Sequence, residues 1–243
     1  MARGGAPAAA RKIFGTKGGH LVVRLPPECR GLGIATFNSQ GEPLYCIPWK
    51  DLHYFGPTES EYTGDLDRIH VTDAEQAYLI REANILLPGL KLTAGDVLMT
   101  WAGVRPLTFD PAVPFGNRSR VLHDLAADGL PDTLAMTAGP VMTHRSAGAE
   151  MAAAVAARLG PANRARRPSA PARRPFVEHA ASLSDVLFRR SGRAWEGPVG
   201  EDELEALAAD AAAALGWDDE ERARQLKLFR EEWAALYRPR NVA

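Results

Sequence analysis

The sequence has few cysteines, no long apolar run and no excess of charge of either sign. Its 243 residues include two cysteines, too few for a disulfide-bonded scaffold or, on their own, a four-ligand zinc site. No stretch approaches the ~20 apolar residues of a membrane-spanning helix. Lys and Arg number 29 against 30 Asp and Glu, which argues against binding nucleic acid over the whole surface. The hydrophobic fraction of 46% is typical of a globular protein. The low cysteine count predicts a reducing compartment and no metal site.

The common motifs of catalysis are also missing. The chain has no G-x-x-x-x-G-K-[ST] phosphate loop, no H-E-x-x-H, no C-x-x-C and no G-x-S-x-G. Gly31-Leu32-Gly33 begins like the dinucleotide-binding G-x-G-x-x-G, but the sixth position is Thr36 and a strand is expected to follow. Motifs alone therefore assign no enzyme class.

Hydrophobic periodicity predicts strands first and helices later. Strands are expected at 20–24, 33–37, 44–49 and 53–56, the second and third joined as a hairpin by a polar loop. Thr72 and Glu75 have the spacing of a capping box, so a helix should run from there to about Leu86. Further strands are expected at 96–105, 118–125 and 133–137, followed by a helix to about Leu159 and three helices after Ser182. The fold class predicted is α+β with an antiparallel-rich sheet.

Composition divides the chain into four parts. Residues 1–14 read as a flexible leader, 15–160 as the main domain and 176–243 as a small helical domain. Between them, 161–175 holds five arginines, no acid and several prolines, which forbid regular structure. This segment is either a solvated linker or a patch for anionic lipid or a partner.

Three basic residues and one turn are candidates for chemistry. His20 follows two glycines at the start of an expected strand. Its role is either that of a hydrogen-bonded edge residue or that of a catalytic base. Arg105 closes an apolar strand, where it must pair with a carboxylate or bind an anionic substrate. Arg120 lies on a solvated face or binds an anion. The turn 138–145 leads from a strand into a helix. It is either an ordinary connection or a site where the free backbone N–H groups of the helix N-terminus bind an anion or a carbonyl.

Taken in order, these pieces resemble the FAD-dependent, quinone-linked glycerol-3-phosphate dehydrogenases. The resemblance covers roughly residues 15–237, and the number and order of its short motifs make it specific. It extends only to the family's C-terminal half, because the G-x-G-x-x-G half that holds the FAD pyrophosphate is absent from this sequence. The motifs are Gly19-His20-Leu21-Val22-Val23, Ile47-Pro48-Trp49, Gly56-Pro57-Thr58-Glu59, Glu61-Tyr62-Thr63-Gly64-Asp65, Gly103-Val104-Arg105-Pro106-Leu107, Ser119-Arg120, Thr143-His144-Arg145, Leu183-Ser184-Asp185-Val186-Leu187-Phe188-Arg189-Arg190 and Leu215-Gly216-Trp217-Asp218.

The resemblance assigns roles residue by residue. It implies that His20 takes the C2 hydroxyl proton of the substrate while a hydride passes to the flavin, a step that suits a group with an ordinary pKa near neutral pH. Arg105 would hold the substrate and stabilise developing alkoxide charge, and Arg120 would bind its phosphate. Gly139 and Thr143 would contact the FAD. The 15–160 part would be the substrate domain with the flavin domain's returning strand and helix, and the last part the family's helical domain.

The implied reaction oxidises sn-glycerol 3-phosphate to dihydroxyacetone phosphate and passes electrons through FAD to quinone. The implied location is the cytoplasm, with at most peripheral contact with the inner membrane. At the flavin-facing turn, however, the family's Gly-Gly-Lys reads Ala138-Gly139-Pro140, which removes a charge and a backbone donor.

Three hypotheses follow. The chain is one half of a split dehydrogenase that needs a separate nucleotide-binding half, an inactive remnant that binds an anion or a partner, or a flavoenzyme for another small substrate. Absence of the nucleotide-binding half should expose apolar surface and favour self-association.

Overall fold

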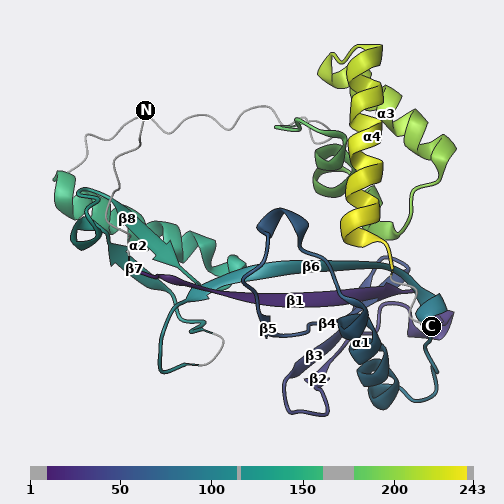
Figure 1. Cartoon of the computed structure of the whole chain (residues 1–243), viewed down its shortest axis with the longest axis horizontal. Helices are drawn as coiled ribbons and strands as arrows, with labels where there is room; N and C mark the ends of the chain where they lie inside the picture. Colours follow the sequence, from purple (N-terminus) through teal and green to yellow (C-terminus); the bar gives the residue numbers. More distant parts are fainter. Residues whose placement is uncertain (1–9, 114–115, 161–177, 240–243) are drawn as a thin grey trace. The chain divides into compact units, whose positions relative to one another are not determined.

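The computed structural model describes residues 10–113, 116–160 and 178–239, which form two compact units. The first, here the sheet unit, comprises 18–58, 64–103 and 178–239. The second, here the hairpin unit, comprises 10–17, 59–63 and 104–160. Figure 1 shows the elements of both units. The described parts are α+β with antiparallel strand pairing, which confirms the fold class predicted from the sequence.

Antiparallel strands form the centre of the sheet unit. β2 (Ile34–Phe37), β3 (Pro43–Trp49), β4 (Leu52–Gly56) and β1 (Ile13–Val23) are neighbours in that order, and β6 (Val97–Thr108) also pairs with β1. The predicted hairpin is confirmed, and its turn is closed by the Asn38 N–H donating to the Glu42 carbonyl at 2.7 Å. β1 begins at Ile13 rather than His20, and within this additional stretch Thr16 and Lys17 pair with a later strand, β5 (Ser60–Glu61).

The two faces of this sheet contribute to two different cores. Leu21 and Val23 of β1 belong to a cluster with Leu79 and Ala83, whereas Val22 between them belongs to a second cluster. This alternation follows from the period of two in a strand. Leu79 and Ala83 of the first cluster belong to α1 (Asp73–Leu86). The predicted capping box at the start of this helix is confirmed.

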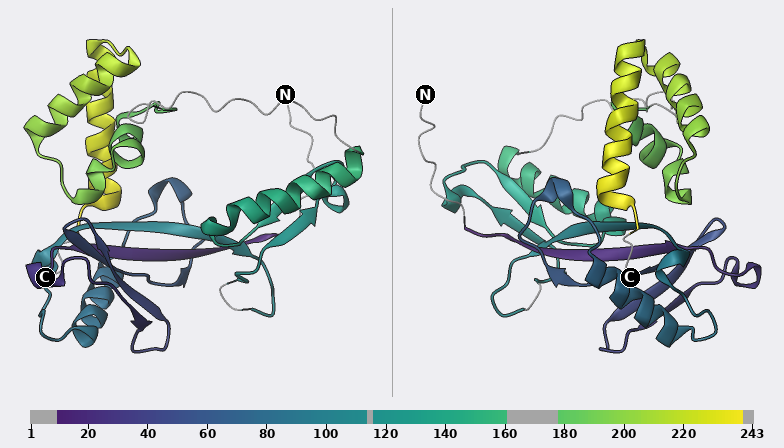
Figure 2. Two further views of the ribbon diagram at one scale, coloured as in Figure 1. Left: turned by 180° about the vertical axis from the view of Figure 1, so that it is seen from behind. Right: turned by 45° about the vertical axis from the view of Figure 1, so that its right-hand side comes forward.

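The second cluster packs the opposite face against the C-terminal helical segment. Its elements are a π-helical turn (Asp185–Arg190), α3 (Glu201–Leu215), α4 (Asp219–Glu232) and a final π-helical turn (Trp233–Tyr237). α3 and α4 pack side by side in every view (Figures 1 and 2). Both ends of the connection between them are capped: Asp218 accepts from the Glu221 N–H at 2.8 Å, and Gly216 ends α3 with a φ of 75°. None of the helices in the described residues is long and apolar enough to cross a membrane.

The hairpin unit is built around β7 (Val121–Asp124) and β8 (Leu134–Thr137), both shorter than predicted. α2 (His144–Leu159) lies along this pair of strands (Figure 2) and buries none of its residues. The Arg-rich segment 161–175 lies outside the described residues, as does most of the leader. Short 3-10 turns occur at Pro27–Cys29, Leu66–Arg68, Ala94–Asp96, Ala126–Asp128, Val141–Thr143 and Arg193–Glu196.

Candidate functional site

His20 lies in the sheet unit, on the face of β1 that also carries Val22. Its imidazole stacks on the indole of Trp101, with ring centroids 3.8 Å apart and planes 8° from parallel. The ring of Tyr54 meets it edge-on at 5.7 Å. Trp101 lies two residues after Met99 on β6, so these side chains share one side of the sheet. Aromatic walls therefore fix the orientation of the imidazole.

The backbone next to His20 is equally constrained. The Gly19 N–H donates to the Thr58 hydroxyl at 2.8 Å, and the Thr58 N–H donates back to the Gly19 carbonyl at 3.1 Å. A Cβ at Gly56 would lie 2.4 Å from the His20 Cδ2 and 2.8 Å from the Gly19 oxygen. Only glycine leaves room for the imidazole at this place.

Arg105 lies in the hairpin unit, near the end of β6. Its Nη1 is 3.9 Å from Oε1 of Glu59, a carboxylate whose side chain is 18% exposed. The same oxygen accepts a hydrogen bond from Arg118 at 2.5 Å. Arg105 is half-buried, and the carboxylate that its position at the end of an apolar strand requires is thus Glu59, which also pairs with Arg118.

Arg120 immediately precedes β7 and is tied to α2. Its Nε and Nη2 each lie 2.9 Å from Oε2 of Glu150, and its Nη1 donates to the Ser146 hydroxyl at 3.1 Å. The side chain is 24% exposed, so it is half-buried rather than lying on an open, solvated face. The guanidinium connects a strand of the hairpin unit to the first two turns of α2.

The turn from β8 into α2 has an unusual backbone. Ala138 and Gly139 are consecutive residues with positive φ, 52° and 83°. The carbon skeleton of Arg120 covers Gly139, 3.4 Å from where a Cβ would be. The Thr143 hydroxyl donates to the Pro140 carbonyl at 2.7 Å and accepts from Arg120 at 3.4 Å. Thus Arg120, Gly139 and Thr143, predicted separately, are in contact.

The predicted site residues are divided between the two units. His20 belongs to the sheet unit, and Arg105, Arg120, Gly139 and Thr143 belong to the hairpin unit. Sequence reasoning missed the residues that hold them, namely Trp101, Gly56, Glu59 and Glu150. A signal existed for Trp101, which is spaced by two from Met99 along a strand. Nothing in the sequence signals the pairing of Arg120 with Glu150, 30 residues apart.

A complete FAD does not fit the residues described. Gly31-Leu32-Gly33 leads into strand β2, as expected, and not into the helix whose N–H groups would hold a pyrophosphate. At the other end, Pro140 has no N–H and the Thr143 hydroxyl is engaged within its own turn. The described residues therefore do not hold a complete flavin by themselves.

Comparison with known proteins identifies the family. The model of the FAD dependent oxidoreductase family matches residues 1–145, which is more than half of the chain. The chain belongs to this family. It is 38% identical over 156 residues to a glycerol-3-phosphate dehydrogenase of Synechocystis sp., covering 61% of this chain and 28% of that protein. It is 36% identical over 123 residues to an alpha-glycerophosphate oxidase of Streptococcus pyogenes, covering 49% and 20%.

A solved structure supports the fold of this chain. The glycerol-3-phosphate dehydrogenase of Bacillus halodurans, complexed with FAD, matches 94% of this chain and 59% of its own, with a TM-score of 0.67 and 18% identity. The chain spans less than a third of the length of the Synechocystis sp. and Streptococcus pyogenes relatives. The family resemblance drawn from the sequence is confirmed.

Proposed function

We propose that this chain supplies the substrate-binding part of a FAD-dependent dehydrogenase that oxidises sn-glycerol 3-phosphate to dihydroxyacetone phosphate and passes the electrons to quinone. The observation that carries the proposal is the 38% identity to the Synechocystis sp. glycerol-3-phosphate dehydrogenase over 61% of this chain. Because this sequence has no pyrophosphate-binding motif, the proposal includes a nucleotide-binding half that lies outside it.

In this proposal, the chain's own residues bind the substrate and move one proton. Arg120 binds the phosphate, since a guanidinium fork matches two phosphate oxygens. His20 accepts the proton of the C2 hydroxyl, and Arg105 stabilises the negative charge that develops on that oxygen. FAD, if held by the nucleotide-binding half, would supply the acceptor for the hydride from C2. The product is the C2 ketone.

The geometry supports these roles at the level of single residues. The imidazole of His20 is held by the stack on Trp101, so its orientation does not depend on the substrate. Arg120 is held by Glu150 and Ser146, which leaves the guanidinium ordered before an anion arrives. Preorganised groups of this kind lose little entropy on binding.

The first experiment is a titration of the purified chain with FAD, followed by flavin absorbance and fluorescence. Because no pyrophosphate site is found among the described residues, we expect no tight, saturable binding by the chain alone. Adding the nucleotide-binding half of the Synechocystis sp. relative should give binding and glycerol 3-phosphate-dependent reduction of a soluble quinone analogue.

Matched variants then test the roles. His20→Gln should lower kcat by about 10²–10⁴-fold, the range of a lost general base, whereas His70→Gln should leave it unchanged. Arg120→Lys should raise KM for glycerol 3-phosphate, and Arg222→Lys should not. No activity with any nucleotide-binding half, combined with retained phosphate binding, would favour the inactive remnant. Activity only with a carboxylate substrate would favour another flavoenzyme.

A further inference from the structure

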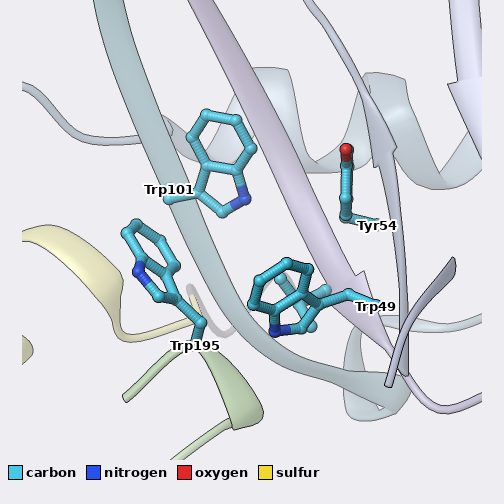
Figure 3. Close-up of a pocket in the computed structure, with 5 residues that line it drawn as sticks. Trp49, Tyr54, Trp101 and Trp195 are labelled. Carbon is cyan, nitrogen blue, oxygen red and sulfur yellow. The ribbon is translucent and has the colours of Figure 1, made fainter. Parts of the chain in front are cut away.

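The sheet unit contains an aromatic pocket that none of the roles above uses. Its volume is about 300 Å³, within the lower range of small-molecule sites. Figure 3 shows the side chains around it. They come from four strands and from the C-terminal helical segment: Val22, Trp49, Tyr54, Trp101 and Trp195.

The walls of this aromatic pocket stand at steep angles to one another. The ring of Trp101 is 6.0 Å from that of Tyr54, with 67° between the planes. It is 6.1 Å from that of Trp195, at 77°. Trp49 stands at the rim, and 43% of its surface is exposed. Aromatic rings from several directions thus offer faces and edges to a flat ligand, the contacts that aromatic pairs prefer.

The polar groups around the pocket donate hydrogen bonds much more than they accept them. An indole N–H only donates. That of Trp195 donates to the Phe188 carbonyl at 2.9 Å and points away from the other labelled rings (Figure 3). The N–H groups of Trp49 and Trp101 have no acceptor within the described part of the chain. A ligand with an accepting oxygen would satisfy them, and one with only donors would not.

Charge at the rim is neutralised. Lys50, next to Trp49, forms an ion pair with Glu196, next to Trp195. The five residues that line the pocket are uncharged. A cationic ligand would therefore find aromatic faces but no unpaired carboxylate in this lining, which favours an uncharged ligand.

We propose that the aromatic pocket binds a flat, uncharged ring system that carries a hydrogen-bond-accepting oxygen. A quinone is such a ring. The choice of a quinone as the natural ligand rests on the electron acceptor proposed above. The binding of a flat, uncharged ring rests on the pocket alone. Two of the lining side chains, Trp101 and Tyr54, also contact the imidazole of His20.

The probe is 2,3-dimethoxy-1,4-naphthoquinone, whose substituted ring carbons do not add protein thiols. Three of the chain's five tryptophans line the pocket, so tryptophan fluorescence reports its occupation, and titration calorimetry gives the affinity independently. Neither measurement involves glycerol 3-phosphate or FAD, so its failure is distinct from failure of the proposed dehydrogenase. We expect one saturable site with a dissociation constant of about 0.1–1 mM, as ordinary ligand efficiency gives for a molecule of this size.

Two variants show whether binding occurs in this pocket. Trp49→Ala removes a rim residue that the core does not need and should weaken binding about tenfold. Phe37→Ala removes another exposed aromatic residue, 69% exposed and outside the lining, and should leave the affinity unchanged. The proposal is overturned by an absence of saturable binding or by equal effects of the two variants. Tighter binding of tetramethylammonium than of the quinone would also overturn it.

Discussion

Replacing Gly56 with alanine places a methyl group where the His20 ring lies. The new Cβ would be 2.4 Å from Cδ2 and 2.8 Å from Cγ of the imidazole, and 2.8 Å from the Gly19 carbonyl oxygen. The ring can respond only by rotating away from its stack on Trp101. The carbonyl is held by the Thr58 N–H at 3.1 Å and cannot move without breaking that bond.

The expected cost is at the upper end of overpacking, about 3 kcal/mol of the free energy of unfolding. Part of this cost arises from the imidazole, and a double-mutant cycle with His20→Ala isolates that part. Once the ring is absent, the clash with the Gly19 oxygen remains but the clash with the imidazole is relieved. Gly56→Ala should therefore cost at least about 1 kcal/mol less in the His20→Ala background, a coupling typical of residues in contact.

Urea unfolding, followed by far-UV circular dichroism, measures all four proteins of the cycle. The matched control is Gly89→Ala, because a Cβ there would have no heavy atom within 4 Å and the φ is not positive. This control should lie within about 0.5 kcal/mol of the parent protein. Additive effects of Gly56→Ala and His20→Ala would refute the argument, since they would show that the methyl group and the imidazole do not meet.

Three further predictions concern other parts of the chain. Ala138→Gly should raise the free energy of unfolding by about 0.5–1 kcal/mol in urea, because it relieves a left-handed residue with a side chain. Glu150→Gln should lower it by about 0.5 kcal/mol or less, since the pair with Arg120 is partly exposed; a loss above about 2 kcal/mol would contradict this. Iodoacetamide at pH 8 should label Cys29 but not Cys46 in the native protein, because burial, followed by the charge of Cys29, raises the pKa of the Cys46 thiol to about 11. Peptide mass spectrometry checks this, and both thiols should react after denaturation.

Most elements could be predicted because their signals are local. The capping box at Thr72, the Gly216 terminus and the Asp218 cap each involve residues within a few positions of one another. The alternation along β1 correctly indicated a strand but not its start. In the stretch that precedes His20, Thr16 and Lys17 pair with residues 60–61, and that pairing spans more than 40 residues of chain. No window of sequence around Ile13 contains this information.

The candidate site divides in the same way. His20, Arg105 and Arg120 could be selected because a charged or titratable residue at a strand end needs a partner. The partners themselves, Glu59 and Glu150, could not be predicted, because each contact joins residues 30 or more positions apart. The family motif at the turn also does not reveal the backbone strain at Ala138, because that strain arises from a φ of 52° that only the structure shows.

The state of Arg120 bears most directly on whether the chain still binds an anion. Its guanidinium is fixed from one side by Glu150, which both orders the group and offsets its charge. An incoming phosphate carries more negative charge than one carboxylate and accepts two hydrogen bonds from a planar fork. Because the side chain remains 24% exposed, part of the arginine is still accessible to such an anion. Phosphate affinity in the parent and in Glu150→Gln therefore separates the two roles of this carboxylate. Tighter binding in the variant shows that Glu150 competes with the anion, and weaker binding shows that it positions Arg120 for it.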